Sequence, residues 1–238
     1  MNFIVRNIIL FLWATIQFTT FNIIFSHVDA LAGWKKEEVI LVGVVMYFTN
    51  GIFKTFFQNN ILQLPKYIRM GQLDGMLLKP IRAIFLVSTR FISLAEFPSM
   101  VVFAIILVRY SFKINPSLTI PTFVLALIMI GIGAVGMFGF LFTLNTIAFW
   151  KPRLWNLSFL SSRVKSLASF PSDIYRGIFR GIVYFSPIAA FTTIPALFLL
   201  GKGSWQLFVY SSFVCFSFFG VAIIAWKRGL LRYESASS

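Results

Sequence analysis

One acidic side chain stands out in this sequence because it falls inside a strongly apolar run. Glu96 lies about halfway along residues 84–108. A carboxylate in such surroundings is costly, so it either pairs with a cation or faces a substrate path. Two interpretations stay open: a structural ion pair of Glu96 with Arg90 or Arg163, or a position in a transport path.

A second polar feature is the segment 155–170, in which two cations stand among serines. Arg163 and Lys165 make this segment too polar to face lipid on every side. If it crosses a membrane, these two side chains should line a protein interior or a water-filled path. The alternative is an amphipathic helix that lies at the membrane surface.

Nothing in the sequence predicts catalysis, a metal site or a bound cofactor. The chain has one histidine, His27, and one cysteine, Cys215, which cannot form a metal site or a disulfide framework. There is also no Walker A sequence, no nucleophile with a neighbouring base and no pair of carboxylates. We therefore expect this chain to have no catalytic residues.

One glycine pattern resembles a nucleotide-binding motif but lies in the wrong surroundings. Gly131, Gly133 and Gly136 spell GxGxxG inside an apolar run of about 30 residues. The dinucleotide-binding motif needs a preceding strand and a solvated helix start instead. With Gly139, these glycines are expected to let another helix approach closely.

Composition identifies the environment of the chain. Of its 238 residues, 58% are hydrophobic and 12% are charged, and the mean hydropathy is +0.86. These values predict an integral membrane protein. Lys and Arg outnumber Asp and Glu by 21 to 7, and they lie mostly between apolar runs. That distribution follows the positive-inside rule and gives no reason to expect nucleic acid binding.

Five apolar runs are long enough to cross about 30 Å of hydrocarbon at 1.5 Å per residue. Residues 8–25 exceed the usual apolar core of a signal peptide, so we interpret the first run as a retained span. The five predicted spans are residues 3–25, 39–57, 84–108, 120–149 and 205–226.

A sixth crossing is expected between the fourth and the last of these runs. Residues 155–170 carry cations that the positive-inside rule would keep in the cytoplasm. Residues 181–200 are apolar but contain Pro187 and Pro195, which would break a lone spanning helix. Composition leaves the choice open. Either choice gives six crossings with both termini in the cytoplasm, beside Lys227, Arg228 and Arg232.

The segment 58–82 is the longest polar connection between spans, and it contains RMGQLDGMLLKP, residues 69–80. Its apolar residues and its two glycines suit short helices that lie at the membrane surface. A plain loop held by lipid headgroups is the alternative. That alternative leaves Asp74 and Pro80 unexplained.

In four places the sequence resembles the permeases of ABC-2 type transporters, in the branch with a separate ATPase and usually a second permease. Gly33-Trp34 and the end of the fourth span, Ala148-Phe149-Trp150, are two of these places. The re-entrant pattern follows at Phe170-Pro171, Ile174-Tyr175, Pro187, Pro195-Ala196 and Leu199-Leu200-Gly201. The coupling pattern is carried by Ile68, Arg69, Gly71, Leu73, Asp74, Leu77, Lys79 and Pro80.

The resemblance implies an all-α membrane fold with six transmembrane helices. Residues 155–172 would be the fifth span, and residues 173–202 would form a re-entrant helix pair in the outer leaflet. Pro171, Pro187 and Pro195 would mark the breaks. Family members usually begin with a cytoplasmic interfacial helix, whereas here Met1 leads almost directly into the first span.

The resemblance also implies partners and a mechanism. An ABC ATPase, in two copies, would bind ATP and Mg, and a second permease, identical or paralogous, would complete the substrate path in a bacterial or archaeal cytoplasmic membrane. The 58–82 loop would transmit ATP hydrolysis through Arg69, Gly71, Leu73, Asp74, Leu77, Lys79 and Pro80. The exported substrate would be a drug-like amphiphile, a lipid or a glycan. An ion-coupled carrier or a non-transporting membrane subunit remains the alternative.

Overall fold

The computed structural model describes residues 3–151 and 157–233, and all regular structure within them is helical. The only bridge between extended residues in this part joins Leu31 and Trp34. The prediction of an all-helical fold is therefore confirmed for the described residues. The α-helices are α1 (Phe3–Phe25), α2 (Lys36–Phe53), α3 (Asn59–Arg69), α4 (Asp74–Leu77), α5 (Ala83–Thr89), α6 (Phe97–Ile114), α7 (Ile120–Thr146), α8 (Leu157–Ser166), α9 (Ile178–Tyr184), α10 (Pro187–Phe191), α11 (Thr193–Leu199) and α12 (Trp205–Leu230).

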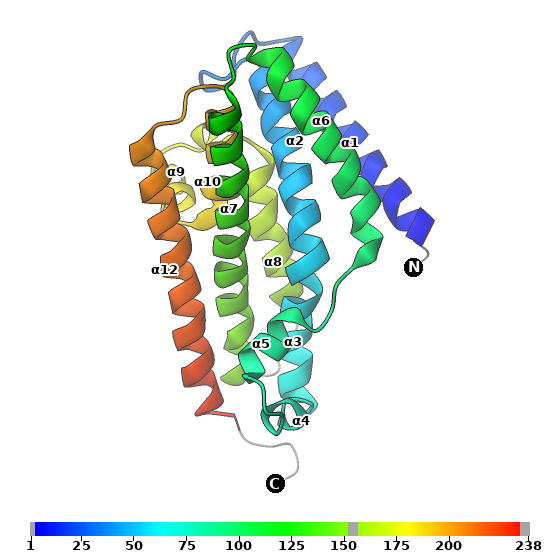
Figure 1. Cartoon of the computed structure of the whole chain (residues 1–238), viewed down its shortest axis with the longest axis vertical. Helices are drawn as coiled ribbons and strands as arrows, with labels where there is room; N and C mark the ends of the chain where they lie inside the picture. Colours follow the sequence, from blue (N-terminus) through cyan, green and yellow to red (C-terminus); the bar gives the residue numbers. More distant parts are fainter. Residues whose placement is uncertain (1–2, 152–156, 234–238) are drawn as a thin grey trace.

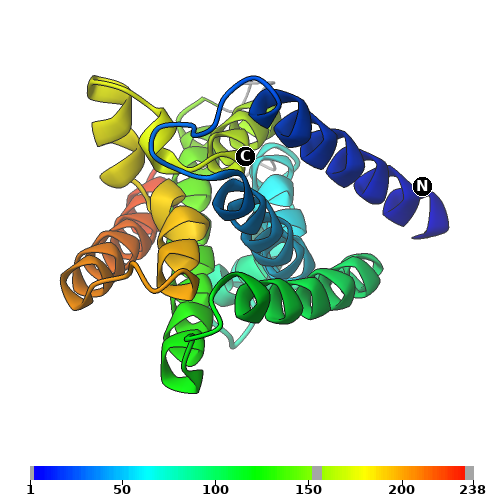
Figure 2. The same ribbon diagram turned by 90° about the horizontal axis from the view of Figure 1, so that it is seen from above.

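The long helices form an elongated bundle (Figure 1). Its lower end in that view carries α3, α4, α5 and the last turn of α12, and we call it the loop end. The opposite end carries the α1–α2 and α6–α7 connections, and we call it the far end. Figure 2 shows α1 at the edge of the bundle, away from α12. Most of α1 is exposed, so its apolar side chains are available to lipid or to a partner subunit.

Five helical segments in the described residues are long and apolar enough to cross a membrane. They overlap the five apolar runs of the sequence, but with different ends. Their bounds are Ile4–Phe25, Lys36–Arg69, Ala83–Ile114, Ile120–Phe149 and Trp205–Leu230.

The second segment does not end at Phe57, where the sequence pattern placed the start of a loop. A π-helical turn, Lys54–Gln58, joins α2 to α3 without a break. The combined helix has 34 residues, or about 51 Å at 1.5 Å per residue, which exceeds the hydrocarbon thickness. Only residues 70–82, which include α4, then remain as a loop. We call these residues the tip loop.

The third segment is broken where the sequence predicted one continuous run. α5 ends at Thr89, and α6 begins at Phe97 after a short 3-10 turn, Leu94–Glu96. Pro98 lies in the first turn of α6, where a missing N–H costs no helical hydrogen bond. Figure 1 shows the extended chain that links the two helices. Glu96 therefore lies at a helix start rather than within a helix.

The sixth crossing stays a prediction. Its expected segment, 155–172, begins outside the described residues, and α8 has only 10 residues before a 3-10 turn at Leu167–Ser169. The re-entrant pair expected at residues 173–202 also stays a prediction, and this segment contains three short helices, α9, α10 and α11. Pro187 opens α10, whereas Pro195 lies within α11 and Pro171 precedes another 3-10 turn. α10 and α11 are mostly buried and pack against α7.

Glycines on α7 allow the closest helix contacts. A Cβ atom at Gly139 would lie 2.7 Å from the backbone of Phe218, and one at Gly136 would lie 2.6 Å from Cys215 Sγ. A Cβ at Gly133 would collide with the Ala190 carbonyl of α10. The predicted role of these three glycines is confirmed. Gly131 differs, because a Cβ there would meet nothing within 4 Å.

We expect Gly139→Ala to lower the thermal stability, because the added methyl group would meet backbone atoms of α12 that cannot rotate away. Overpacking of this kind costs about 1–3 kcal/mol. Gly131→Ala is the matched control and should be neutral or stabilising, since alanine is the better helix former. Cys215 is fully buried, so a thiol-reactive dye reports unfolding directly. Equal unfolding temperatures for the two variants would contradict this account of the α7–α12 contact.

Candidate functional site

A pocket of about 480 Å³ opens between α1, α2, the turn at Glu96 and α8. We call it the polar pocket. Four charged side chains line it, together with uncharged residues that carry amide and hydroxyl groups. The charged residues are Arg6, Lys54, Glu96 and Lys165, and the uncharged polar residues include Gln17, Tyr47, Asn50, Ser162, Ser166 and Ser169.

Glu96 is the most buried of the charged residues in this pocket, with 1% of its surface exposed. Arg6 Nη2 lies 2.5 Å from Glu96 Oε1, and Lys54 Nζ lies 4.0 Å from Oε2. The break in the third segment makes this geometry possible, because it places Glu96 at the start of α6 instead of on its side. A buried carboxylate that faces two cations is electrostatically compensated.

The predicted partners of Glu96 were wrong. The Arg90 guanidinium lies over the rings of Tyr67 and Phe91 at 5.8 and 5.4 Å. Arg163 lies over the Phe159 ring at 4.7 Å, and it does not line the polar pocket. Of the three residues predicted for a path, the structure therefore brings together Glu96 and Lys165 only.

Lys165 connects α8 to the π-helical turn of the second segment. Its ammonium group donates a hydrogen bond to Gln58 Oε1 and lies 5.6 Å from the centre of the Phe53 ring. Sequence reasoning missed Arg6 and Lys54. The sequence contained the information needed to find them, because both are cations inside predicted apolar spans.

Two sets of hydrogen bonds tie the long second segment to the break in the third. Asn60 Nδ2 donates to the Phe91 carbonyl, and the Phe91 N–H donates to Asn60 Oδ1, both at 2.9 Å. The Ser93 N–H also donates to the Thr55 carbonyl at 2.9 Å. Thr55 belongs to the π-helical turn, a feature often found at functional positions. A movement of α3 would therefore reach the chain beside Glu96.

The seven predicted coupling residues differ in whether they are buried in the chain or exposed. Leu73 is fully buried, and Gly71 has φ +67°, a conformation that favours glycine. These two residues hold the loop in shape. Leu77, Lys79 and Pro80 are exposed on the outer side of the loop, and Arg69 is exposed at the end of α3.

Leu78 is the residue of this loop that sequence reasoning missed, and it is 87% exposed. Met70, 52% exposed, and Leu77, 42% exposed, also lie on the outer side. Outward-facing apolar side chains that lie together indicate a contact with a protein or with the membrane surface. The leucine pattern alone did not reveal which leucine faces outward.

Asp74 begins α4 and lies near the C-terminal end of the described chain. Burial raises the pKa of Tyr233 to about 12, and the neighbouring Asp74 carboxylate contributes to that increase. Tyr233 also contacts the Phe149 ring at 6.1 Å between centroids. Asp74 therefore links the tip loop to the end of α12 within this chain.

Comparison with known proteins gives one match. The family model described as ABC-2 family transporter protein matches residues 11–237. No curated protein and no solved structure matches the chain.

Proposed function

The chain belongs to the ABC-2 transporter family, and from that premise we propose that it is the permease subunit of an ATP-driven exporter, coupled through its tip loop to a separate ATPase. Family membership and the apolar helices make it a multi-pass membrane component of an ABC transporter. ATP and Mg would be bound by the ATPase, present in two copies. A second permease, identical or paralogous, would complete the substrate path.

The proposed topology has six crossings, with α8 as part of the fifth and with α9–α11 re-entrant in the outer leaflet. Ser162 and Ser166 of α8 support this, because they turn part of the polar surface of this helix toward the polar pocket. The loop end carries many cations and would lie in the cytoplasm of a bacterium or archaeon, with both termini. Its cations include Lys66, Arg69, Lys79, Arg82, Lys227, Arg228 and Arg232.

Cations at the far end oppose this orientation, but two of them are paired. Arg180 Nη2 lies 2.7 Å from Asp173 Oδ1, and Lys202 Nζ lies 2.6 Å from Glu38 Oε1. Each pair compensates its cation locally. The positive-inside rule counts Lys and Arg rather than net charge, so the proposed orientation rests on the larger number of cations at the loop end.

The observation that carries the proposal is the continuous connection from the tip loop to the polar pocket. ATPase closure would push the exposed face of the loop, and α3 would carry that movement along the long second segment. The bonds of Asn60 and Thr55 would pass it to the break beside Glu96. The ion pairs of Glu96 with Arg6 and Lys54 would then rearrange.

The charge of the polar pocket favours one class of substrate. Arg6, Lys54 and Lys165 provide three cations, and Glu96 is the one carboxylate among the residues that line the pocket. Glu96 is already paired, so a cationic amphiphile would find no free partner there. An amphiphile or glycan with an anionic group fits the excess positive charge better.

The proposal is tested by purifying the chain from its native membrane under conditions that would retain a bound ABC ATPase. We expect the chain alone to hydrolyse no ATP and to co-purify with that ATPase as a complex that does. An ion-coupled carrier or a non-transporting subunit would be purified without the ATPase. Transport by the chain alone, driven by an ion gradient in vesicles, would overturn the proposal.

A further inference from the structure

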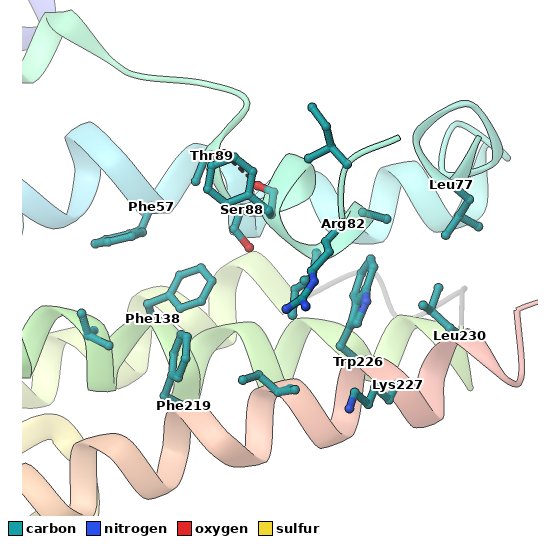
Figure 3. A pocket seen from close by; sticks show the side chains of 16 residues that line it. Phe57, Leu77, Arg82, Ser88, Thr89, Phe138, Phe219, Trp226, Lys227 and Leu230 are labelled. Carbon is teal, nitrogen blue, oxygen red and sulfur yellow. Dashed lines mark hydrogen bonds between the residues drawn. The ribbon is translucent and has the colours of Figure 1, made fainter. Parts of the chain in front are cut away.

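A second and larger pocket, of about 870 Å³, lies between α5, α7 and α12 near the loop end. We call it the α5–α12 pocket. Its wall is mostly apolar and contains several aromatic rings, three of which, Phe57, Phe138 and Phe219, are visible together in Figure 3. Its size falls within the roughly 300–1,000 Å³ of small-molecule sites.

Two cations interrupt the apolar wall, namely Arg82 and Lys227. In Figure 3 the Arg82 side chain points into the pocket between α5 and α12. No carboxylate of residues 3–151 or 157–233 forms an ion pair with either cation. No acidic residue appears among the residues that line the pocket. The pocket therefore combines an apolar interior with uncompensated positive charge.

The position of these cations matches a membrane interface. Lys227 lies in the last turn of α12, directly after Trp226, and Arg82 immediately precedes α5. Tryptophan at the end of a spanning helix marks the level of the lipid headgroups. In the proposed orientation, the apolar part of the pocket would lie in the cytoplasmic leaflet, which carries anionic lipids.

We propose that the α5–α12 pocket binds an anionic glycerophospholipid of the cytoplasmic leaflet. One acyl chain lies among the aromatic rings, and Arg82 and Lys227 hold the phosphate. Leu77, Ile81 and Arg82 of the tip loop form part of the wall, and α12 forms another part. The bound lipid therefore joins the tip loop to α12. The proposal rests on the orientation proposed above, but it does not require an ATPase.

The test measures the lipids that the detergent-purified chain retains in native mass spectrometry after incubation with phosphatidylglycerol or phosphatidylcholine of identical acyl chains. We expect retention of phosphatidylglycerol to exceed that of phosphatidylcholine by about tenfold, since two interfacial cations favour an anionic headgroup. The double variant Arg82→Gln/Lys227→Gln should lose this preference. Inorganic phosphate at equal concentration should not compete, because it lacks acyl chains.

The matched control is Arg228→Gln/Arg232→Gln, which removes the same charge from the loop end of the bundle. Both of these arginines are exposed, and neither lines the pocket. This control should keep the preference for phosphatidylglycerol. Ile223→Trp, which fills the apolar wall and leaves both cations in place, should reduce retention of phosphatidylglycerol.

Three results would overturn the proposal. Equal retention of the two lipids would mean that the pocket has no headgroup preference. An equal effect of both double variants would mean that the preference for phosphatidylglycerol comes from the general surface charge and not from the pocket. Undiminished retention in Ile223→Trp would place the lipid elsewhere. None of these results bears on ATPase assembly, so they leave the proposed transport function to its own test.

Discussion

The Leu78→Asp variant is expected to fold and insert normally but to lose its ATPase. Leu78 is 87% exposed, so the change removes almost no contact within the chain. At an apolar interface, however, the new carboxylate would be buried without a partner, which is strongly unfavourable. We expect both co-purification with the ATPase and ATP hydrolysis by the complex to fall by at least about tenfold, as for the loss of one interface hot spot.

Leu231→Asp is the matched control for this prediction. Leu231 is also 87% exposed and lies just beyond α12 at the loop end, so the two variants add the same charge to equally exposed positions. Leu231→Asp should assemble with the ATPase normally. Equal loss in both variants would mean a general effect of negative charge, and no loss in Leu78→Asp would remove the tip loop from the contact.

The Glu96→Ala variant should show the largest loss of stability. Removing the carboxylate leaves Arg6 and Lys54 facing each other in the polar pocket without compensation. Loss of one partner from a fully buried ion pair costs about 3–5 kcal/mol. We expect roughly 2–4 kcal/mol here, because the side chains of Arg6 and Lys54 are 33% and 25% exposed and solvent weakens the interaction.

Thermal unfolding followed by labelling of Cys215 measures this loss, with Glu38→Ala as the control. Glu38 pairs with Lys202, which is 50% exposed, and accepts a hydrogen bond from the Lys35 N–H at the start of α2, so that variant should lose roughly 1–2 kcal/mol, less than Glu96→Ala. Equal losses in the two variants would contradict the burial argument. Glu96→Gln then separates the two roles of Glu96. Lower stability with unchanged transport would mean a structural role, and impaired transport with unchanged stability would mean a position in the transport path.

The sequence predicted those structural features that depend on one local property, such as a long apolar run or a missing side chain. Long apolar runs specify spanning helices, and Gly133, Gly136 and Gly139 could be assigned to close helix contacts because only a missing side chain permits them. Glu96 was identifiable as a candidate residue because a carboxylate in an apolar run is costly unless it is paired or functional. None of these inferences required knowledge of distant contacts.

The sequence failed where partners come from far along the chain. Asn60 looked like part of a loop, yet its amide is satisfied by the backbone of Phe91, 31 positions away, so the helix continues through it. The Arg6 partner of Glu96 is 90 positions away, so no local pattern could select it over Arg90. In the tip loop, the turn at Gly71 decides that Leu73 points inward and Leu78 outward.

The most direct test of the coupling claim is a photo-cross-link from the tip loop to the ATPase. A benzophenone maleimide is attached to Leu78→Cys in the purified complex, since buried Cys215 does not compete for the reagent. Ile120→Cys, exposed at the far end, is the control. The account predicts an adduct with the ATPase from Leu78→Cys and none from Ile120→Cys. An ATP-hydrolysing complex that gives no ATPase adduct from Leu78→Cys would contradict it.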